Sequence, residues 1–119
     1  MKNSTFRTII GKTPVLFSAP HAHAHRRPQL SGAYKYGEPF TDVIVEQLCE
    51  MSNGFGIMQI SETDYDYNYH TEKDNPYKKR VKEFVKSEKI KYFLDIHGLK
   101  DGCLYDIAIY YPTKFTKSM

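Results

Sequence analysis

The amino-acid sequence predicts an α/β fold in a single domain over residues 1–119, with three layers. We expect a mixed, mostly parallel sheet of about five strands, with helices on both faces. A chain of 119 residues has single-domain length. Short apolar runs alternate with segments of helical periodicity, which is typical of this class. Two of the apolar runs lead directly into histidines, at the end of a strand where open α/β sheets bind ligands.

The apolar runs predict five strands. Residues 5–10 and 15–19 are the first two, and their short connection predicts that they are antiparallel neighbours. The near-continuous apolar character of residues 15–19 places that strand in the centre of the sheet. Residues 55–60 and 90–96 are the third and fourth strands. The fifth, 104–110, must return antiparallel because residues 98–102 are too short for a parallel crossover.

Two segments have helical periodicity. The first begins near Pro39 and ends at Asn53-Gly54. Its predicted apolar face contains Phe40, Val43, Ile44, Leu48 and Met51. The second has Asn75 as its cap and Pro76 at its first position, with an apolar stripe of Tyr77, Val81, Phe84 and Val85. Residues 21–37 and 62–70 are predicted to be loops, the first of them long and polar.

Composition and charge exclude several classes of function. The formal net charge of +3 is mild and the lysines are interspersed with glutamates, so we expect no nucleic-acid partner. Cys49 and Cys103 lack a CxxC partner and are interpreted as free thiols. The N-terminus lacks the apolar stretch of a signal peptide, and no apolar run approaches the ~20 residues of a membrane span. We therefore expect a cytoplasmic protein without a membrane partner.

The two strand ends predict a metal site. If the two helices cover opposite faces, the strand that ends at His21 lies beside the strand that ends at His97. Imidazole is a common zinc ligand, and a carboxylate often completes a catalytic set of three. Glu38, at the start of the first helix, is the best candidate for that carboxylate. Asp95 shares a strand face with His97 and could orient it.

Alternatives to these metal ligands remain open. His23 or His25 could replace His21, because three histidines follow one another at a spacing of two. We favour His21, since it lies nearest the strand end, and then place His23 in the lining of the pocket. A histidine that follows a strand can also be an ordinary loop residue.

Three arginines could bind an anionic substrate. Arg26 and Arg27 belong to the first loop, and Arg80 lies on the second helix. Guanidinium groups bind carboxylates bidentately, although these three could equally be ordinary surface residues. No GxSxG motif or glycine-rich phosphate loop is present, and Ser18 lacks the context of a nucleophile.

Several short motifs, in their order and spacing, resemble the N-formylglutamate amidohydrolase family. The resemblance covers residues 14–110, and that family is similar in fold to the zinc carboxypeptidases and to the aspartoacylase group. The motifs are Ser18-Ala19-Pro20-His21, Glu38-Pro39-Phe40-Thr41, Asp66-Tyr67-Asn68, Asn75-Pro76-Tyr77, Asp95-Ile96-His97-Gly98 and Asp106-Ile107.

The resemblance implies a phosphorylase/hydrolase-like fold and an amide hydrolase with one zinc ion. His21, Glu38 and His97 match the metal ligands, and Glu38 and Asp95 are the expected catalytic carboxylates. Asp66 and Asn68 match a substrate-binding loop, and Arg80 or Arg26 would hold the carboxylate of a small anionic substrate. Family members are longer and carry their general base later in the chain, and Glu62 is a weak substitute.

The sequence therefore leaves three alternative functions. The leading one is a zinc hydrolase of an N-acylated amino acid. The second is a metal- or ligand-binding relative with weak or absent catalysis. The third is an interaction domain that uses Tyr65, Tyr67 and Tyr69 as a partner surface. Self-association is a further expectation.

Overall fold

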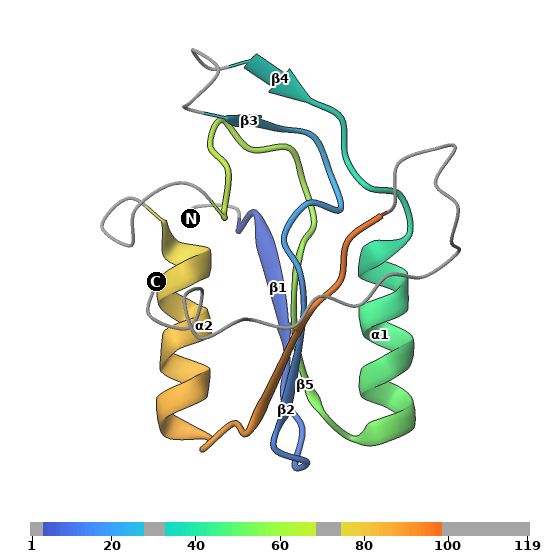
Figure 1. The fold of residues 1–119 in the computed structure, drawn as a ribbon, viewed down its shortest axis with the longest axis vertical. Coiled ribbons are helices and arrows are strands. Elements are labelled where there is room, and N and C mark those ends of the chain that lie inside the picture. Colours follow the sequence, from blue (N-terminus) through green and yellow to red (C-terminus); the bar gives the residue numbers. More distant parts are fainter. Residues whose placement is uncertain (1–3, 28–32, 69–74, 99–119) are drawn as a thin grey trace, which may run out of the picture.

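The computed structural model describes residues 4–27, 33–68 and 75–98, which form a small α/β fold. Its main sheet has four strands in the order β1-β5-β2-β6 (Figure 1). β1 pairs antiparallel with β5, and β2 pairs parallel with both β5 and β6. The elements are β1 (Phe6–Ile9), β2 (Val15–Ala19), β3 (His25–Arg27), β4 (Ala33–Lys35), α1 (Thr41–Ser52), β5 (Phe55–Gln59), α2 (Pro76–Ser87) and β6 (Tyr92–Asp95). The α/β class and mixed sheet are confirmed, whereas the predicted strand at 104–110 lies outside the described residues.

The central position of β2 and its pairing with β6 are confirmed. Four of the five residues of β2 are buried, as expected for a strand covered on both faces. Ser18 stands opposite Asp95, and the Ile96 N–H extends the pairing by donating to the Ser18 carbonyl at 2.7 Å. Because the two strands are parallel, the segments that follow them leave from the same edge of the sheet.

The predicted pairing of the first two strands is wrong, because β5 lies between β1 and β2. The turn after β1 crosses the start of β5 instead of closing a hairpin. There the N–H groups of Lys12 and Thr13 donate to the Asn53 carbonyl at 2.8 and 3.0 Å. The crossing needs a glycine at position 11, since a Cβ there would overlap the backbone carbonyl of Gly54.

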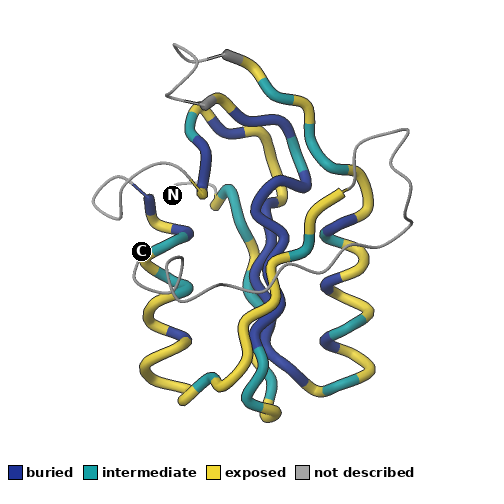
Figure 2. The backbone as a smooth tube through the Cα atoms, viewed as in Figure 1, coloured by how far each residue is buried: buried dark blue, intermediate teal, exposed yellow. Residues whose placement is uncertain are grey.

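Two core clusters form around β2, and each includes residues of one helix. Successive residues of β2 point to opposite faces, so Leu16 and Phe17 belong to different core clusters. Leu16 packs with Phe55, Ile57, Tyr67 and two residues of α2, Tyr77 and Phe84. Phe17 packs with Ala19, Met58 and two residues of α1, Val45 and Cys49. Figures 1 and 2 show the two helices on either side of the buried strands.

The predicted apolar face of α1 is wrong. The helix begins at Thr41, after Phe40 in a left-handed conformation, and it buries Thr41, Val45 and Cys49. Four of the five predicted face residues are exposed, namely Phe40, Val43, Ile44 and Met51. Gly56 of β5 explains the choice, because a Cβ there would lie only 2.7 Å from Cys49 Sγ. Because the helix lies close to the sheet, it packs through its smaller side chains, Val45 and Cys49, rather than through the larger ones of the predicted face.

Other local predictions have mixed outcomes. The Asn75 cap is confirmed, since its side chain accepts from the Lys78 N–H at 3.1 Å. Val85 is exposed rather than part of the buried stripe. The segment 21–37 is not wholly a loop, because β3 and β4 pair as an antiparallel ribbon. The Arg26 guanidinium lies over the ring of Tyr34, its opposite residue, which favours that pairing.

Among the described residues, no helix has the length and apolar character needed to cross a membrane.

Candidate metal centre

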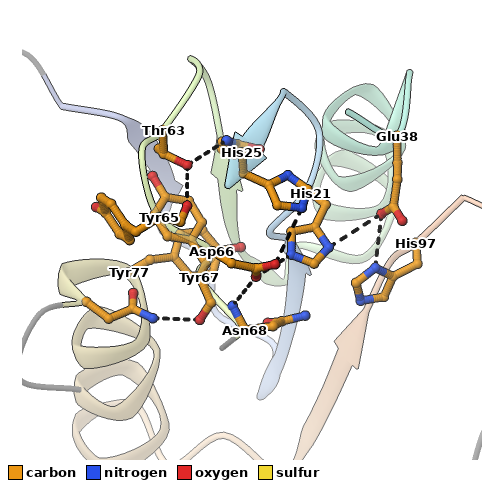
Figure 3. A network of polar contacts seen from close by, with 12 residues as sticks. His21, His25, Glu38, Thr63, Tyr65, Asp66, Tyr67, Asn68, Tyr77 and His97 are labelled. Carbon is orange, nitrogen blue, oxygen red and sulfur yellow. Dashed lines mark hydrogen bonds and ion pairs between the residues drawn. The ribbon is translucent and has the colours of Figure 1, made fainter. Parts of the chain in front are cut away.

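Three segments deliver the central side chains. His21 follows β2, His97 follows β6, and Glu38 precedes α1 (Figure 3). The Glu38 N–H donates to the His21 carbonyl at 2.6 Å, which joins two of the three segments directly. Gly37 permits this approach, since a Cβ there would lie 2.6 Å from the Ala22 carbonyl oxygen. The backbone therefore fixes where the Glu38 side chain begins.

The first cluster, called the outer group, consists of His21, Glu38 and His97. Its three ligand atoms all lie within 4.8 Å of one another. Glu38 Oε1 is 4.0 Å from His21 Nδ1 and 3.0 Å from His97 Nδ1. His21 is buried, whereas Glu38 and His97 are partly exposed. Two imidazole nitrogens and a carboxylate are a donor set that can bind a metal.

Asp66 fixes the ring of His21 from behind. His21 Nε2 lies 2.7 Å from Asp66 Oδ1, in a fully buried contact. Because a carboxylate accepts, Nε2 carries the hydrogen, and Nδ1 presents its lone pair to the outer group. Burial would raise the pKa of Asp66, but hydrogen bonds from His21 and the Asn68 N–H, with the electrostatic influence of His21 and His25, outweigh it and lower the pKa.

His97 is held in the same way by Asp95. Its Nε2 lies 3.1 Å from Asp95 Oδ2, while Nδ1 faces Glu38. The hydrogen bond with Asp95, followed by that with Glu38, raises the pKa of His97 from 6.5 to about 10. In the metal-free protein His97 is therefore a cation between two carboxylates. A metal ion would take the place of the proton on Nδ1.

A second cluster, called the inner group, shares His21 with the first. It consists of His21, His25 and Asp66, all buried, with ligand atoms within 4.8 Å of one another. The rings of His21 and His25 stack at 4.1 Å with an interplanar angle of 11°. His25 Nε2 is 3.5 Å from Asp66 Oδ2. Asp66 therefore lies between two imidazoles, one on each carboxylate oxygen.

Two residues that sequence reasoning missed hold the loops of the centre. Gln59, fully buried at the end of β5, accepts from the His23 N–H at 2.8 Å and donates to the Ala24 carbonyl at 3.2 Å. Asn75 donates to the Tyr67 carbonyl at 2.6 Å and so anchors the segment that contains Asp66. A glutamine at the end of an apolar strand is a signal that could have identified the first of them.

The other predicted site residues have different surroundings. His23 is partly exposed, 3.8 Å from Asp42. Asn68 is exposed and follows Asp66 at the edge of the centre (Figure 3). Arg80 contacts Glu83 at 3.3 Å and the ring of Phe84, both in its own helix.

The remaining candidates lie on or near the hairpin. Arg26 is exposed on β3, and Arg27 ends the same strand. The carboxylate of Glu62 accepts from the Tyr34 hydroxyl at 3.2 Å. Buried Ser18 contacts the Tyr77 hydroxyl at 2.6 Å. The structure thus brings together the predicted His21, Glu38, Asp66, Asp95 and His97, while Arg26 contacts Tyr34 in the hairpin and Arg80 contacts residues of α2.

Comparison with known proteins identifies no relatives. No family model, no curated protein and no solved structure matches this chain. The function therefore has to be argued from the geometry of the centre. Its His, Asp and Glu clusters could bind a metal ion.

Proposed function

We propose that the protein is a zinc-dependent hydrolase of a linear amide, similar to the N-formylglutamate amidohydrolases, with one zinc ion in the outer group. One observation carries the proposal. Each histidine of the outer group turns one nitrogen toward Glu38 and has the other nitrogen held by a carboxylate, Asp66 or Asp95. Carboxylate-held imidazoles are the usual arrangement around zinc in proteins.

The residues of the centre have separate tasks in this proposal. When bound, zinc would supply Lewis acidity toward the amide carbonyl and toward a water molecule. Asp66 and Asp95 keep the two rings in the orientation and tautomer that a metal needs. Glu38, partly exposed, provides the carboxylate ligand, and we assign it proton transfer as well.

The proposed substrate is an N-acylated amino acid or a similar small carboxylate. Asn68 is exposed beside Asp66, and we propose that it contacts the substrate. His23 and the arginines Arg26, Arg27 and Arg80 remain proposed contributors to substrate binding, whereas the buried Asp66 would contribute by positioning His21. The proposal extends to a cytoplasmic location and to the three-layer form of the fold, with a fifth strand.

A second candidate is a metal-binding relative without turnover. This candidate is favoured because each carboxylate near the outer group in the described part of the chain already contacts a histidine. Glu38 and Asp95 contact His97, and Asp66 is buried against His21. A general base separate from these three is not found among the described residues around the outer group.

Turnover separates the two candidates. The zinc-loaded protein is assayed with N-formyl and N-acetyl amino acids, beside His97→Gln and a control variant, Glu50→Gln, on the exposed side of α1. The hydrolase predicts release of the free amino acid by the wild type and the control, and loss of at least 10²-fold in His97→Gln. Zinc binding without hydrolysis would instead establish the metal-binding relative.

A further inference from the structure

The inner group has its own complete set of metal ligands. His21 Nε2 and His25 Nε2 approach the two oxygens of Asp66 at 2.7 and 3.5 Å. His25 Nδ1 lies 3.1 Å from the His23 carbonyl oxygen, so the ring hydrogen belongs on Nδ1 and the lone pair on Nε2. The stacked rings direct both Nε2 atoms toward the same carboxylate.

We propose that His25, Asp66 and Nε2 of His21 form a second position for a divalent transition-metal ion, alternative to the outer group. Two imidazoles and one carboxylate suit zinc and cobalt, whereas calcium and magnesium prefer oxygen ligands. The hydrogen now on His21 Nε2 would leave this nitrogen when the ion binds. The inner group is more buried than the outer group, so its ion would exchange more slowly with solvent.

The two positions exclude each other because they use opposite nitrogens of His21. A neutral imidazole has one lone pair and one N–H. An outer ion takes Nδ1 and leaves the hydrogen on Nε2, donated to Asp66. An inner ion takes Nε2 and moves the hydrogen to Nδ1, which faces Glu38 at 4.0 Å. The tautomer of His21 is therefore the switch between two metal positions, and the inner one leaves the outer group without a ligand.

Cobalt binding to the metal-free full chain tests the inner position. His97→Gln disables the outer group, His25→Gln disables the inner group, and the double variant disables both. Each single variant is expected to bind one Co²⁺ with the visible absorption of a nitrogen- and oxygen-ligated ion, and the double variant none. A folded His97→Gln protein that binds no Co²⁺ overturns the proposal, and so does a double variant that binds as much as His97→Gln.

A second measurement needs no change at the buried His25. In His97→Gln with ¹⁵N-labelled histidines, zinc should change the ¹⁵N chemical shifts of Nε2 in both His21 and His25. This test does not require the His25 variants to fold. Zinc should also move the His21 hydrogen to Nδ1, because Nε2 becomes the ligand. A His21 that keeps its hydrogen on Nε2 when zinc is present, or a His25 Nε2 that does not shift, contradicts the inner position. Neither measurement uses amide hydrolysis, so absence of turnover would count against the proposed function and leave this inference standing.

Discussion

Asp66 is the residue on which the chemistry of the centre depends most. It is fully buried, and each of its oxygens lies near one imidazole. Its contact with His21 decides which ring nitrogen can bind a metal in the outer group. The sequence alone assigns Asp66 to substrate binding. In the structure its surroundings are those of a residue that orients the metal ligand His21.

Replacing Asp66 with asparagine should weaken metal binding by about 10–100-fold. The amide keeps the shape of the carboxylate but loses its charge, so it holds the His21 hydrogen less strongly and is a poorer inner ligand. Zinc titration against a competing chelator measures the change, with a thermal melt to verify folding. Glu62→Gln, a loss of charge on an exposed carboxylate that contacts Tyr34, is the control and should bind as the wild type does. Equal affinity in both variants would refute the role of Asp66.

The raised pKa of His97 predicts how the metal-free protein responds to pH. A histidine whose pKa rises from 6.5 to about 10 on folding stabilises the folded state fully below pH 6.5, and this contribution is lost as pH rises through 10. The side chain is 37% exposed, so screening by solvent reduces the effect. Denaturant unfolding in a chelator should show the free energy of unfolding falling across this range. In His97→Gln the fall should be smaller, and an identical pH profile would contradict the prediction.

At the scale of elements, the segment before α1 controls the outer group. Gly37 lies against the backbone of Ala22 and His23, and the next residue, Glu38, bonds to the His21 carbonyl. Backbone atoms cannot turn aside as the end of a side chain can. The fit between these two segments therefore sets the distance between Glu38 and His21.

Gly37→Ala should reduce metal affinity by at least tenfold, because the added methyl pushes the segment that contains Glu38 away from His21. Gly54→Ala is the matched control. Its methyl would lie 2.7 Å from Val15 Cγ1, at the opposite end of β5 from the centre, so it should lower stability without changing affinity. Calorimetric titration of both variants with zinc gives the comparison. Equal affinities would show that the Gly37 contact does not position Glu38.

The sequence predicts the elements better than their contacts. Helix ends at Asn53 and Asn75 follow from local chemistry, since a left-handed cap and a side-chain acceptor need no distant partner. The buried face of α1 depends instead on Gly56, a residue of another element, and apolar periodicity alone selects the wrong side. The order of β1 and β5 likewise depends on a turn that crosses a neighbouring strand.

The same division holds for the centre. The sequence is enough to predict that His21 and His97 lie close together, because parallel strands end at the same edge of the sheet. It also predicts Glu38 nearby, because the first helix starts at that edge. The burial of Asp66 and the stacking of His25 could not be predicted from the sequence. Residues 60–68 have no periodicity, and their path depends on hydrogen bonds from Gln59 and Asn75. Long-range hydrogen bonds to loop backbone leave no pattern in the nearby sequence.

For the whole molecule, the outer ligands tie together segments far apart in the chain. They come from the end of β2, the start of α1 and the end of β6. An ion that binds only the folded state at a hundred times its Kd should add about 2.7 kcal/mol to the free energy of unfolding. Thermal unfolding with zinc and with a chelator measures this increase. His23→Gln, outside both groups, should show the same increase, whereas His21→Ala should show none; an increase retained in His21→Ala would contradict the assignment.

The parallel pairing of β2 with β6 also has a consequence for the folding pathway. Between these strands the chain must build α1, β5 and α2, so their contact closes a long loop and forms late. Neither His21 nor His97 can meet the other until that step is complete. We therefore expect a metal ion that binds only the folded state to slow unfolding rather than to speed folding.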